Sequence, residues 1–281
     1  MSAPQRVDQT SFSTSSSMEE VTAELPILAL TLTAGLLAVG LIAGCGSSSS
    51  DNKAADNQKV LKVGAETTFP PFEFTEGDKY VGFDVDLADA LAKKMGYKME
   101  FKSMGFDALI PALKSKDIDM IASGINPTPE RAKAILFSDP YFDKGGFVTV
   151  VKKDNTTIKD MSSLAGKRIG AQIGTVGADL AHKVPNANVK EVDSNSQLFT
   201  ELKAGTIDAV IIDNPVALYY MKQGADKDLK IAGAPVDAEP FVFGFRMDDK
   251  DLQAQVNKAL ADLKADGTYQ KIYDKWFGAS K

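Results

Sequence analysis

The chain has 281 residues, of which 44% are hydrophobic and 25% are charged, as is usual for globular proteins of one or two domains. Its net charge is -6 at pH 7 and its pI is about 5.0. This acidic balance argues against nucleic-acid binding, because a protein that binds phosphates needs a basic surface. It suits a solvated domain at a cell surface.

An uncharged apolar segment runs from Leu25 to Gly44 and ends at Cys45, the only cysteine. Its length approaches the ~20 residues of a membrane-spanning helix, which is one interpretation. The Ile-Ala-Gly-Cys run that begins at Ile42 resembles a lipobox, however, and the Gly-Ser run at 46–50 is typical of a flexible tether. Lipidation also explains a cysteine without a possible disulfide partner. We therefore predict that Cys45 carries a lipid anchor.

The segment before the apolar run departs from an ordinary signal sequence, since Arg6 is its only basic residue. The true start of the chain is therefore left open. We assign residues 1–44 to a signal region with a lipobox and residues 45–58 to a flexible tether. Both are excluded from the prediction of the fold.

The remaining sequence alternates predicted strands with predicted helices. A β-branched run at 60–65 (VLKVGA) predicts a strand, and the near-helical spacing of apolar residues at 83–94 (FDVDLADALAKK) predicts a helix. Further helices are expected at 106–114 and 177–183, and further strands at 118–122, 168–171 and 207–212. This alternation predicts an α/β fold with largely parallel sheets, in which ligands bind at the carboxyl ends of the strands.

Six runs, in this order, resemble one known family. They are ETTFPPFEF at 66–74, YVGFDVDL at 80–87, LIPAL at 109–113, GINPTPER at 124–131, FSDPYF at 137–142 and DGTYQKIYDKWFG at 266–278. From about residue 60 to the end, the chain is similar to the amino-acid-binding proteins of bacterial ABC importers. The resemblance is to the polar amino acid class, which includes glutamine-, arginine- and histidine-binding proteins.

The resemblance implies a two-lobed periplasmic-binding-protein fold, α/β in class, with two hinge crossovers. Lobe 1 would comprise residues 59–141 and 241–281, and lobe 2 residues 146–236. The hinges would lie near 142–145 (FDKG) and 237–240 (DAEP), where Gly and Pro suit either bending strands or ordinary turns.

The resemblance also implies a function. The protein would be extracytoplasmic, held to the cell membrane by its lipid, and would need no cofactor. It would capture a polar L-amino acid, either arginine or lysine or else glutamine, and deliver it to the permease subunits of an ABC transporter. Which amino acid binds, which permease is served and which type of cell envelope is involved are left open.

Two charged residues match the family's ligands for the backbone groups of an amino acid. Arg131 corresponds to the arginine that binds the carboxylate, for which a guanidinium offers two parallel hydrogen bonds. Asp213 corresponds to the ammonium ligand, although an Asp before Asn-Pro is also a common helix N-cap or Asx turn. Because the two residues belong to different lobes, an amino acid bound to both would favour the closed form.

Five further residues match positions around those charges. Phe69 and Phe106 correspond to rings that pack on the aliphatic carbons of the ligand, with ordinary core packing as the alternative. Ser123, Gly124 and Asn126 would supply polar groups, with Gly124 permitting a close approach. Many relatives carry a hydroxyl residue at the position of Asn126, so the role of its side chain is left open.

Selectivity should depend on Glu66 and Gln172. The position of Glu66 is often Asp in glutamine and basic amino acid binders, and that of Gln172 is Lys in some glutamine binders. A neutral Gln172 leaves the carboxylate of Glu66 uncompensated, which favours a cationic ligand, although a carboxylate also accepts hydrogen bonds from glutamine. Thr175 lies where a helix begins, so its hydroxyl and the following amides could face the ligand carboxylate.

Two other functions were weighed. A cyclohexadienyl dehydratase-like enzyme on the same fold would need an acidic proton donor, for which Glu66 is the evident candidate. A ligand-sensing domain would need an output module, which the sequence does not show. His182 has no Cys or second His near it, so no metal site is expected. The retained Asp213 favours binding over the dehydratase chemistry.

Overall fold

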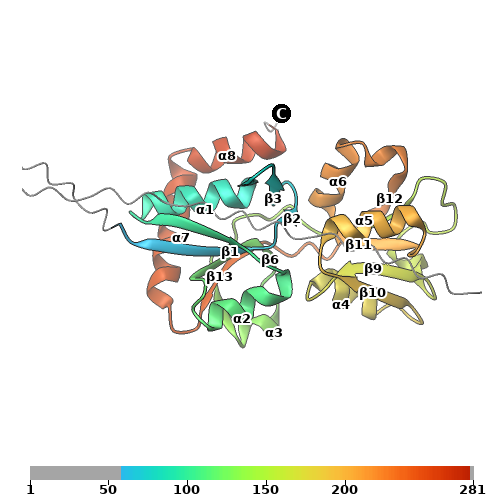
Figure 1. Ribbon diagram of the computed structural model, residues 1–281, viewed down its shortest axis with the longest axis horizontal. Coiled ribbons are helices and arrows are strands. Elements are labelled where there is room, and N and C mark those ends of the chain that lie inside the picture. Colours follow the sequence, from blue (N-terminus) through green and yellow to red (C-terminus); the bar gives the residue numbers. More distant parts are fainter. Residues whose placement is uncertain (1–57, 279–281) are drawn as a thin grey trace, which may run out of the picture. The chain divides into compact units, whose positions relative to one another are not determined.

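The computed structural model describes residues 58–278, which fold into two five-stranded sheets, a small three-stranded sheet and covering helices (Figure 1). The predicted signal region, Cys45 and nearly all of the predicted tether lie outside the described residues. No helix within 58–278 is both long and apolar enough to span a membrane.

The first sheet joins strands from both ends of the described chain. Its spatial order is β5 (Lys98–Ser103), β1 (Val60–Ala65), β6 (Met120–Ile125), β13 (Val242–Arg246) and β7 (Ile135–Phe137). Strands β5, β1 and β6 are parallel, whereas β13 is antiparallel to both of its neighbours.

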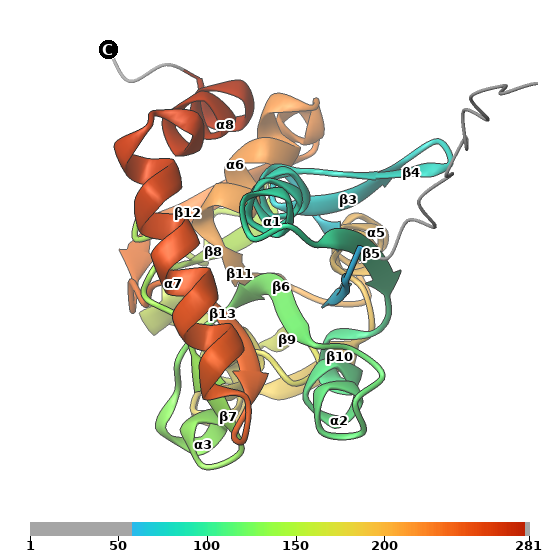
Figure 2. The ribbon, with the colours of Figure 1, turned by 90° about the vertical axis from the view of Figure 1, so that its left-hand side faces the viewer.

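Helices cover both faces of this sheet, because alternate residues of its central strands point to opposite sides. On one face Met120 of β6 belongs to the apolar cluster of α1 (Phe83–Lys94), α7 (Lys250–Ala265) and α8 (Thr268–Phe277). On the other face Ile121 clusters with α2 (Leu109–Lys114), and the short α3 (Pro129–Ala132) contacts β7. Figure 2 shows α1 and α2 on opposite sides of β6.

The second sheet repeats this plan. Its spatial order is β10 (Asn188–Val192), β9 (Arg168–Gln172), β11 (Ala209–Asp213), β8 (Phe147–Lys152) and β12 (Leu229–Val236). Strands β10, β9 and β11 are parallel, and β8 is antiparallel to both β11 and β12.

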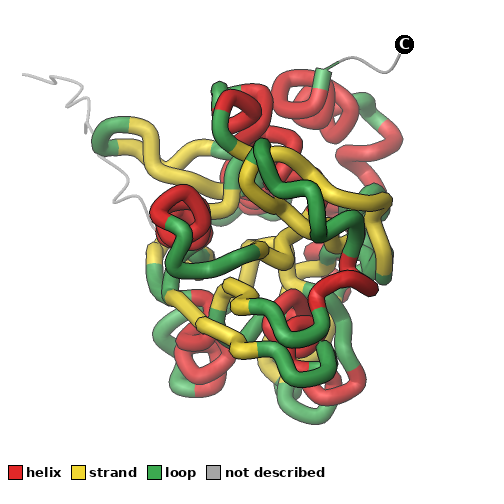
Figure 3. The backbone as a smooth tube through the Cα atoms, turned by 90° about the vertical axis from the view of Figure 1, so that its right-hand side faces the viewer, coloured by secondary structure: helices red, strands yellow, loops and turns green. Residues whose placement is uncertain are grey.

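Helices again cover both faces of the second sheet. Val210 of β11 clusters with α5 (Asn195–Ala204) and α6 (Asn214–Lys222), whereas its neighbour Ala209 clusters with α4 (Val176–His182). Figure 3 shows the strands lying between helices when the molecule is seen from this end.

The remaining elements are short. The three-stranded sheet consists of β2 (Thr68–Phe69), β3 (Glu73–Glu76) and β4 (Lys79–Val81), which connect β1 to α1. Between residues 58 and 278, 3₁₀ turns occur at Phe106–Ala108, Met161–Leu164 and Ala225–Lys227.

The chain passes between the two sheets twice, and each sheet contains one reversed strand. These reversed strands are β8 and β13, and each is the first strand in the sequence after a crossing. The crossings lie at the carboxyl ends of the parallel strands. A strand that begins at a crossing therefore runs antiparallel to the parallel strands of the sheet that it joins. The crossings touch where Phe241 N–H donates to the carbonyl of Phe142 at 2.8 Å. This topology brings the carboxyl ends of the parallel strands of both sheets toward the crossings.

The two-lobed α/β fold predicted from the sequence is confirmed in its architecture. The helix at 83–94 and the strand at 60–65 have the predicted limits, and the other predicted elements are displaced by one to three residues at their ends. The predicted helix at 106–114 begins with a 3₁₀ turn before it becomes α2.

Candidate functional site

An enclosed cavity lies where the carboxyl ends of strands from the two sheets meet. It is lined by Glu66, Phe69, Phe106, Ser123, Gly124, Asn126, Phe147, Gln172, Thr175 and Asp213. Its free volume is about 20 Å³, which is room for roughly one water molecule. An amino acid therefore enters only if the lobes separate or the lining side chains shift.

The structure brings the predicted ligand residues together at this cavity, with Arg131 as the one that contacts its walls rather than lining it. The Arg131 guanidinium donates to the carbonyl of Asn126 at 2.9 Å and to that of Gly174, in the other lobe, at 3.0 Å. Its carbon Cζ lies 5.3 Å from the centre of the Phe106 ring. Phe147 lines the cavity but was not predicted, because a Phe that begins a buried strand looks like an ordinary core residue.

Arg131 is positioned by a short capped helix. Thr128 is the N-cap of α3 and its hydroxyl accepts from Arg131 N at 3.2 Å, while Pro129 supplies the first helical residue. Burial lowers the pKa of Arg131 to about 10, opposed by the carboxylates of Asp179 and Asp213. The guanidinium is therefore charged at neutral pH.

Asp213 ends β11 and occupies the N-cap position of α6, yet its side chain makes no capping hydrogen bond. The Asn214 N–H donates instead to the carbonyl of Gly146 at 2.7 Å. Burial raises the pKa of Asp213 to about 7, and a backbone hydrogen bond and the charge of Arg131 oppose that rise. The Asp213 side chain therefore does not cap α6. Its carboxylate is available to bind a cation.

Thr175 is engaged locally. Its hydroxyl accepts from Ala178 N at 3.2 Å, as the N-cap of α4, and donates to the carbonyl of Gln172 at 2.7 Å. Both hydrogen bonds fix the turn that leads out of β9. The Thr175 hydroxyl thus shapes this wall of the cavity.

Glu66 is 5% exposed, and its Oε2 atom has no hydrogen-bond partner among the described residues. Burial raises the pKa of Glu66, and the neighbouring polar groups of Thr68 and Gln172 oppose that rise. The amide of Gln172 is held within its own lobe: Nε2 donates to the carbonyl of Asp193 at 2.9 Å, and Oε1 accepts from Asn195 Nδ2 at 3.0 Å. Asn195 was not anticipated from the sequence, in which it looks like a residue at the start of a helix.

Phe69 serves both roles weighed from the sequence, since it lines the cavity and packs against Phe72 with ring centres 5.4 Å apart. It also explains Gly124, which has φ +50°. A β-carbon at that position would lie 2.6 Å from Phe69 Cε1, so only glycine fits beneath the ring.

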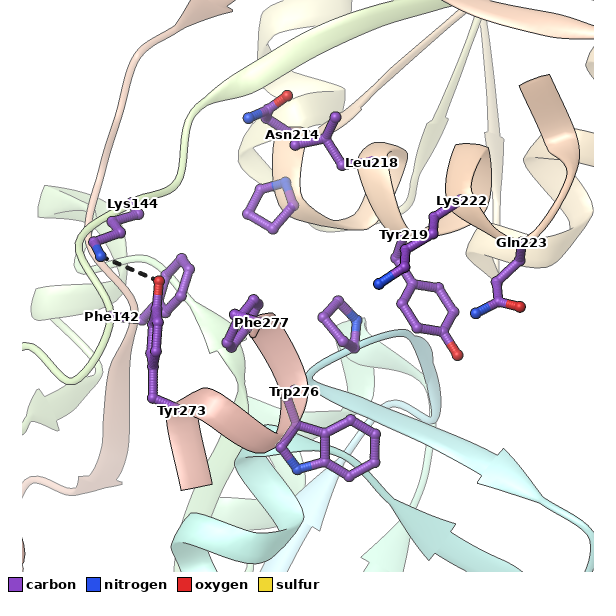
Figure 4. A pocket seen from close by; sticks show the side chains of 12 residues that line it. Phe142, Lys144, Asn214, Leu218, Tyr219, Lys222, Gln223, Tyr273, Trp276 and Phe277 are labelled. Carbon is purple, nitrogen blue, oxygen red and sulfur yellow. Dashed lines mark hydrogen bonds between the residues drawn. The ribbon is translucent and has the colours of Figure 1, made fainter. Parts of the chain in front are cut away.

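A larger hollow of about 340 Å³ lies between α6 and α8, beside the crossing at Phe142 (Figure 4). Its walls carry aromatic rings and two lysines, and Lys144 Nζ donates to Tyr273 Oη at 3.1 Å. None of the predicted ligand residues lines it. The cavity at the strand ends is the better candidate, because polar groups converge there on the buried carboxylate of Glu66, one oxygen of which has no hydrogen-bond partner within residues 58–278.

Within residues 58–278, no group of three or more His, Cys, Asp or Glu residues is arranged to hold a metal ion. His182 hydrogen-bonds Glu191 at 2.7 Å on the surface of lobe 2.

Two α/β lobes, connected by paired crossings and enclosing charged, polar and aromatic groups from both sides, define a two-lobed binding protein. A family model described as bacterial extracellular solute-binding proteins, family 3, matches residues 61–279. The chain belongs to this family. Its class is therefore that of solute-binding proteins, rather than that of the dehydratase-like enzyme considered from the sequence.

Relatives agree with that assignment. The "Arginine-binding extracellular protein ArtP" of Bacillus subtilis is 38% identical over 256 residues, which cover 90% of this chain and 98% of that protein. The "ABC transporter arginine-binding protein 1" of Escherichia coli is 40% identical over 231 residues, covering 79% of this chain and 93% of that protein.

Solved structures are similar as well. "An ancestral arginine-binding protein bound to arginine" has 48% identity and a TM-score of 0.76, covering 79% of this chain and 99% of that one. The same description bound to glutamine has 47% identity and a TM-score of 0.73, with the same coverage. The resemblance to amino-acid-binding proteins of ABC transporters is thereby confirmed.

Proposed function

We propose that this protein is the substrate-binding component of a bacterial ABC importer and that it captures a polar L-amino acid in the cavity between its lobes. The observation that carries the proposal is the placement of Arg131 and Asp213 on opposite lobes beside one cavity. Arg131 would bind the carboxylate of the amino acid, and Asp213 would bind its ammonium group.

This arrangement couples binding to closure of the lobes. An amino acid held by Arg131 alone or by Asp213 alone makes half of the contacts, and only the closed form makes both sets. The ligand therefore shifts the population toward the closed form by its difference in affinity for the two forms. A permease that recognises the closed form would then receive loaded protein.

We favour a cationic ligand, arginine or lysine, with glutamine as the second candidate. Glu66 supplies a buried carboxylate with one oxygen lacking a partner among the described residues, and Gln172 adds no charge to compensate it. The relatives named above as arginine-binding proteins support the same choice. Glutamine stays in consideration because a similar ancestral protein has also been solved with glutamine bound.

A thermal-shift screen of the purified full-length chain against the twenty amino acids tests the proposal. A ligand that binds only the folded protein stabilises it by RT ln(1 + [L]/Kd), about 4 kcal/mol at 1,000-fold excess over Kd. We expect the largest shifts with arginine and lysine. If no amino acid raised the melting temperature, the proposed function would be wrong.

We propose that the lobes have the limits predicted from the sequence, 59–141 with 241–281 for lobe 1 and 146–236 for lobe 2. The membership of the two sheets and the Phe142–Phe241 bridge between the crossings support these limits. The segments 142–145 and 237–240 would then act as hinges. Asp237, in the second hinge, has φ +49°, a conformation that residues other than glycine rarely adopt.

We further propose that the protein is extracytoplasmic and lipid-anchored through Cys45, as the lipobox pattern predicts. A Cys45→Ser variant should take up no lipid, because a serine hydroxyl cannot form the thioether to the diacylglyceryl group. Labelling of cells with a radioactive fatty acid measures this, and Ser47→Ala serves as a control that should label normally. Normal labelling of Cys45→Ser would refute the anchor.

A further inference from the structure

Two carboxyl groups, those of Glu73 and Asp84, are completely buried in lobe 1 behind the cavity wall. Glu73 begins β3 and Asp84 lies in the first turn of α1, and both are 0% exposed. Neither lines the cavity. Burying a carboxyl without need is costly, so such a pair calls for an explanation.

Glu73 holds the hydroxyl of Ser123. Ser123 Oγ donates to Glu73 Oε1 at 2.7 Å and accepts from Glu66 N at 3.0 Å. One hydroxyl thus connects the buried Glu73 to two residues that line the cavity. Because the Ser123 hydroxyl donates its hydrogen bond to Glu73, the buried Glu73 determines how that hydroxyl is oriented.

Asp84 holds the backbone of Gly124. Asp84 Oδ2 accepts from Gly124 N at 3.1 Å and from Tyr141 Oη at 2.5 Å. Gly124 has φ +50°, a left-handed conformation inside strand β6. The carboxylate therefore receives an N–H that this conformation directs toward α1, and it fixes the backbone beneath Phe69.

The other oxygens of the two carboxyls, Glu73 Oε2 and Asp84 Oδ1, have no hydrogen-bond partner among the described residues. The two carboxyls bond adjacent residues, Ser123 and Gly124, so they lie close together in the same buried region. Two ionised carboxylates buried this close would repel each other, whereas one proton between them would supply a hydrogen bond. Asp84 is the better anion, because it accepts from two donors and lies near the N-terminus of α1.

We propose that Glu73 and Asp84 share one proton and act as positioning residues, holding the Ser123 hydroxyl and the Gly124 N–H in place in the cavity wall. The inference rests on the proposed function, since it concerns affinity for the same amino acid. It assigns to the buried pair a role in binding that does not require contact with the ligand.

The electrostatic surroundings agree with a shared proton. Burial and the neighbouring Asp84 raise the pKa of Glu73 well above its usual range, and burial raises that of Asp84 to about 6. The titratable groups that face the pair are Glu66, on the side of the cavity, and Tyr141, from the segment before the first crossing. Neither can compensate two negative charges. The proposal therefore places the shared proton on Glu73 and leaves Asp84 as the anion.

Infrared spectroscopy tests the shared proton without any ligand. At pH 8 the full-length protein should show the carbonyl stretch of a protonated carboxyl, and Glu73→Gln should remove it. Glu66→Gln and Asp213→Asn serve as controls that should retain it. If Glu73→Gln left the spectrum unchanged, the two carboxyls would not share a proton and the inference would be wrong.

Calorimetric titration with arginine tests the positioning role. Glu73→Gln keeps an acceptor for Ser123 and a donor for Asp84, so its Kd should stay within about threefold of the wild type. Glu73→Leu loses both, and its Kd should rise about tenfold or more, as expected when hydrogen bonds to a charged group are lost. Glu76→Leu, at the exposed end of the same strand, is the matched control.

Asp84→Asn keeps the test decisive if Glu73→Leu does not fold. Its weaker acceptor for Gly124 N–H should also raise Kd about tenfold, while Asp89→Asn on the exposed side of α1 should have no effect. A lowered melting temperature with unchanged Kd in the folded variants would make the pair merely structural. Failure of the wild type to bind any amino acid would instead overturn the proposed function.

Discussion

The two lobes share a plan but hold their cavity residues by different means. In lobe 1 the cavity wall at Ser123 and Gly124 is fixed from behind by buried carboxyls. In lobe 2 the wall at Gln172 and Thr175 is fixed by neutral groups, namely a helix cap, a backbone carbonyl and the amide of Asn195. The same α/β scaffold thus supports one segment of wall held by buried carboxyls and one held by neutral groups.

Each lobe also contributes one charge for the proposed ligand, and removing either should have the largest effect. Arg131→Ala and Asp213→Ala should each weaken amino acid binding by about 30-fold to several thousand-fold, because losing one partner of a desolvated ion pair costs about 2 to 5 kcal/mol. Titration calorimetry with arginine measures the change.

Matched controls exist on both lobes. Lys133→Ala alters an exposed cation at the end of α3, and Asp228→Ala alters an exposed carboxylate before β12. Both should bind with wild-type affinity. If either Arg131→Ala or Asp213→Ala bound as tightly as these controls, that residue would be removed from the site.

The pH dependence of binding sharpens the comparison. Burial raises the pKa of Asp213 to about 7 in the ligand-free protein, and an ammonium group would lower it again. Affinity should therefore fall as the pH drops below about 7, up to about tenfold per unit. Binding below this pH should release a proton, which calorimetry in buffers of different ionisation enthalpy detects.

The raised pKa of Asp213 also determines how the stability of the folded protein changes with pH. A raised pKa in the folded state means that the folded protein binds the proton more tightly than the unfolded chain, whose Asp has a pKa near 3.9. The contribution of Asp213 is therefore most favourable at about pH 4 and is lost as the pH rises to about 7. Asp213→Asn should flatten this part of the stability curve. An unchanged curve in the variant would contradict the assigned shift.

Selectivity for a cationic ligand should depend on the carboxylate of Glu66 in lobe 1. Glu66→Gln should weaken arginine and lysine about tenfold more than glutamine, since a charge-assisted hydrogen bond contributes about 1.5 to 3 kcal/mol against ~1 for a neutral one. Competition titrations with the three amino acids compare the losses directly. Equal losses for all three would mean that Glu66 only shapes the wall.

Much of the fold was predictable because its signals are local. The apolar periodicity of 83–94 and the β-branched run at 60–65 specify a helix and a strand without reference to other parts of the chain. The reversed strands β8 and β13 carry no such signal, because their direction is decided by the crossing from the other lobe. No local pattern encodes that.

The site was predictable only where a residue has a recognisable chemical role. Arg131 and Asp213 could be chosen because each carries a charge in a characteristic run of sequence. Phe147 and Asn195 could not, since one resembles a core residue and the other a residue at the start of a helix. Asp84, within the run YVGFDVDL, looked like an ordinary acidic residue in the first turn of a helix, and only its burial reveals otherwise.

The smallest expected effect concerns a direct hydrogen bond between the lobes, from Asn195 N in lobe 2 to Thr68 Oγ1 in lobe 1 at 2.9 Å. Thr68→Val removes the hydroxyl while preserving shape, so it should destabilise the closed form by about one hydrogen bond, 0.5 to 1.5 kcal/mol, and raise Kd by roughly 2- to 12-fold.

Because closure holds the ligand in place, the change should occur mainly as faster dissociation, which stopped-flow fluorescence measures. The neighbouring Thr67 is the matched control: its hydroxyl bonds Ser103 Oγ at 2.7 Å within lobe 1, so Thr67→Val should leave dissociation unchanged. Thr68→Ser should restore it. Thr68 also helps to lower the pKa of Glu66, so the measurement is best made with glutamine, whose binding depends least on the charge of that carboxylate. Equal dissociation rates for Thr68→Val and Thr67→Val would show that this hydrogen bond between the lobes does not retain the ligand.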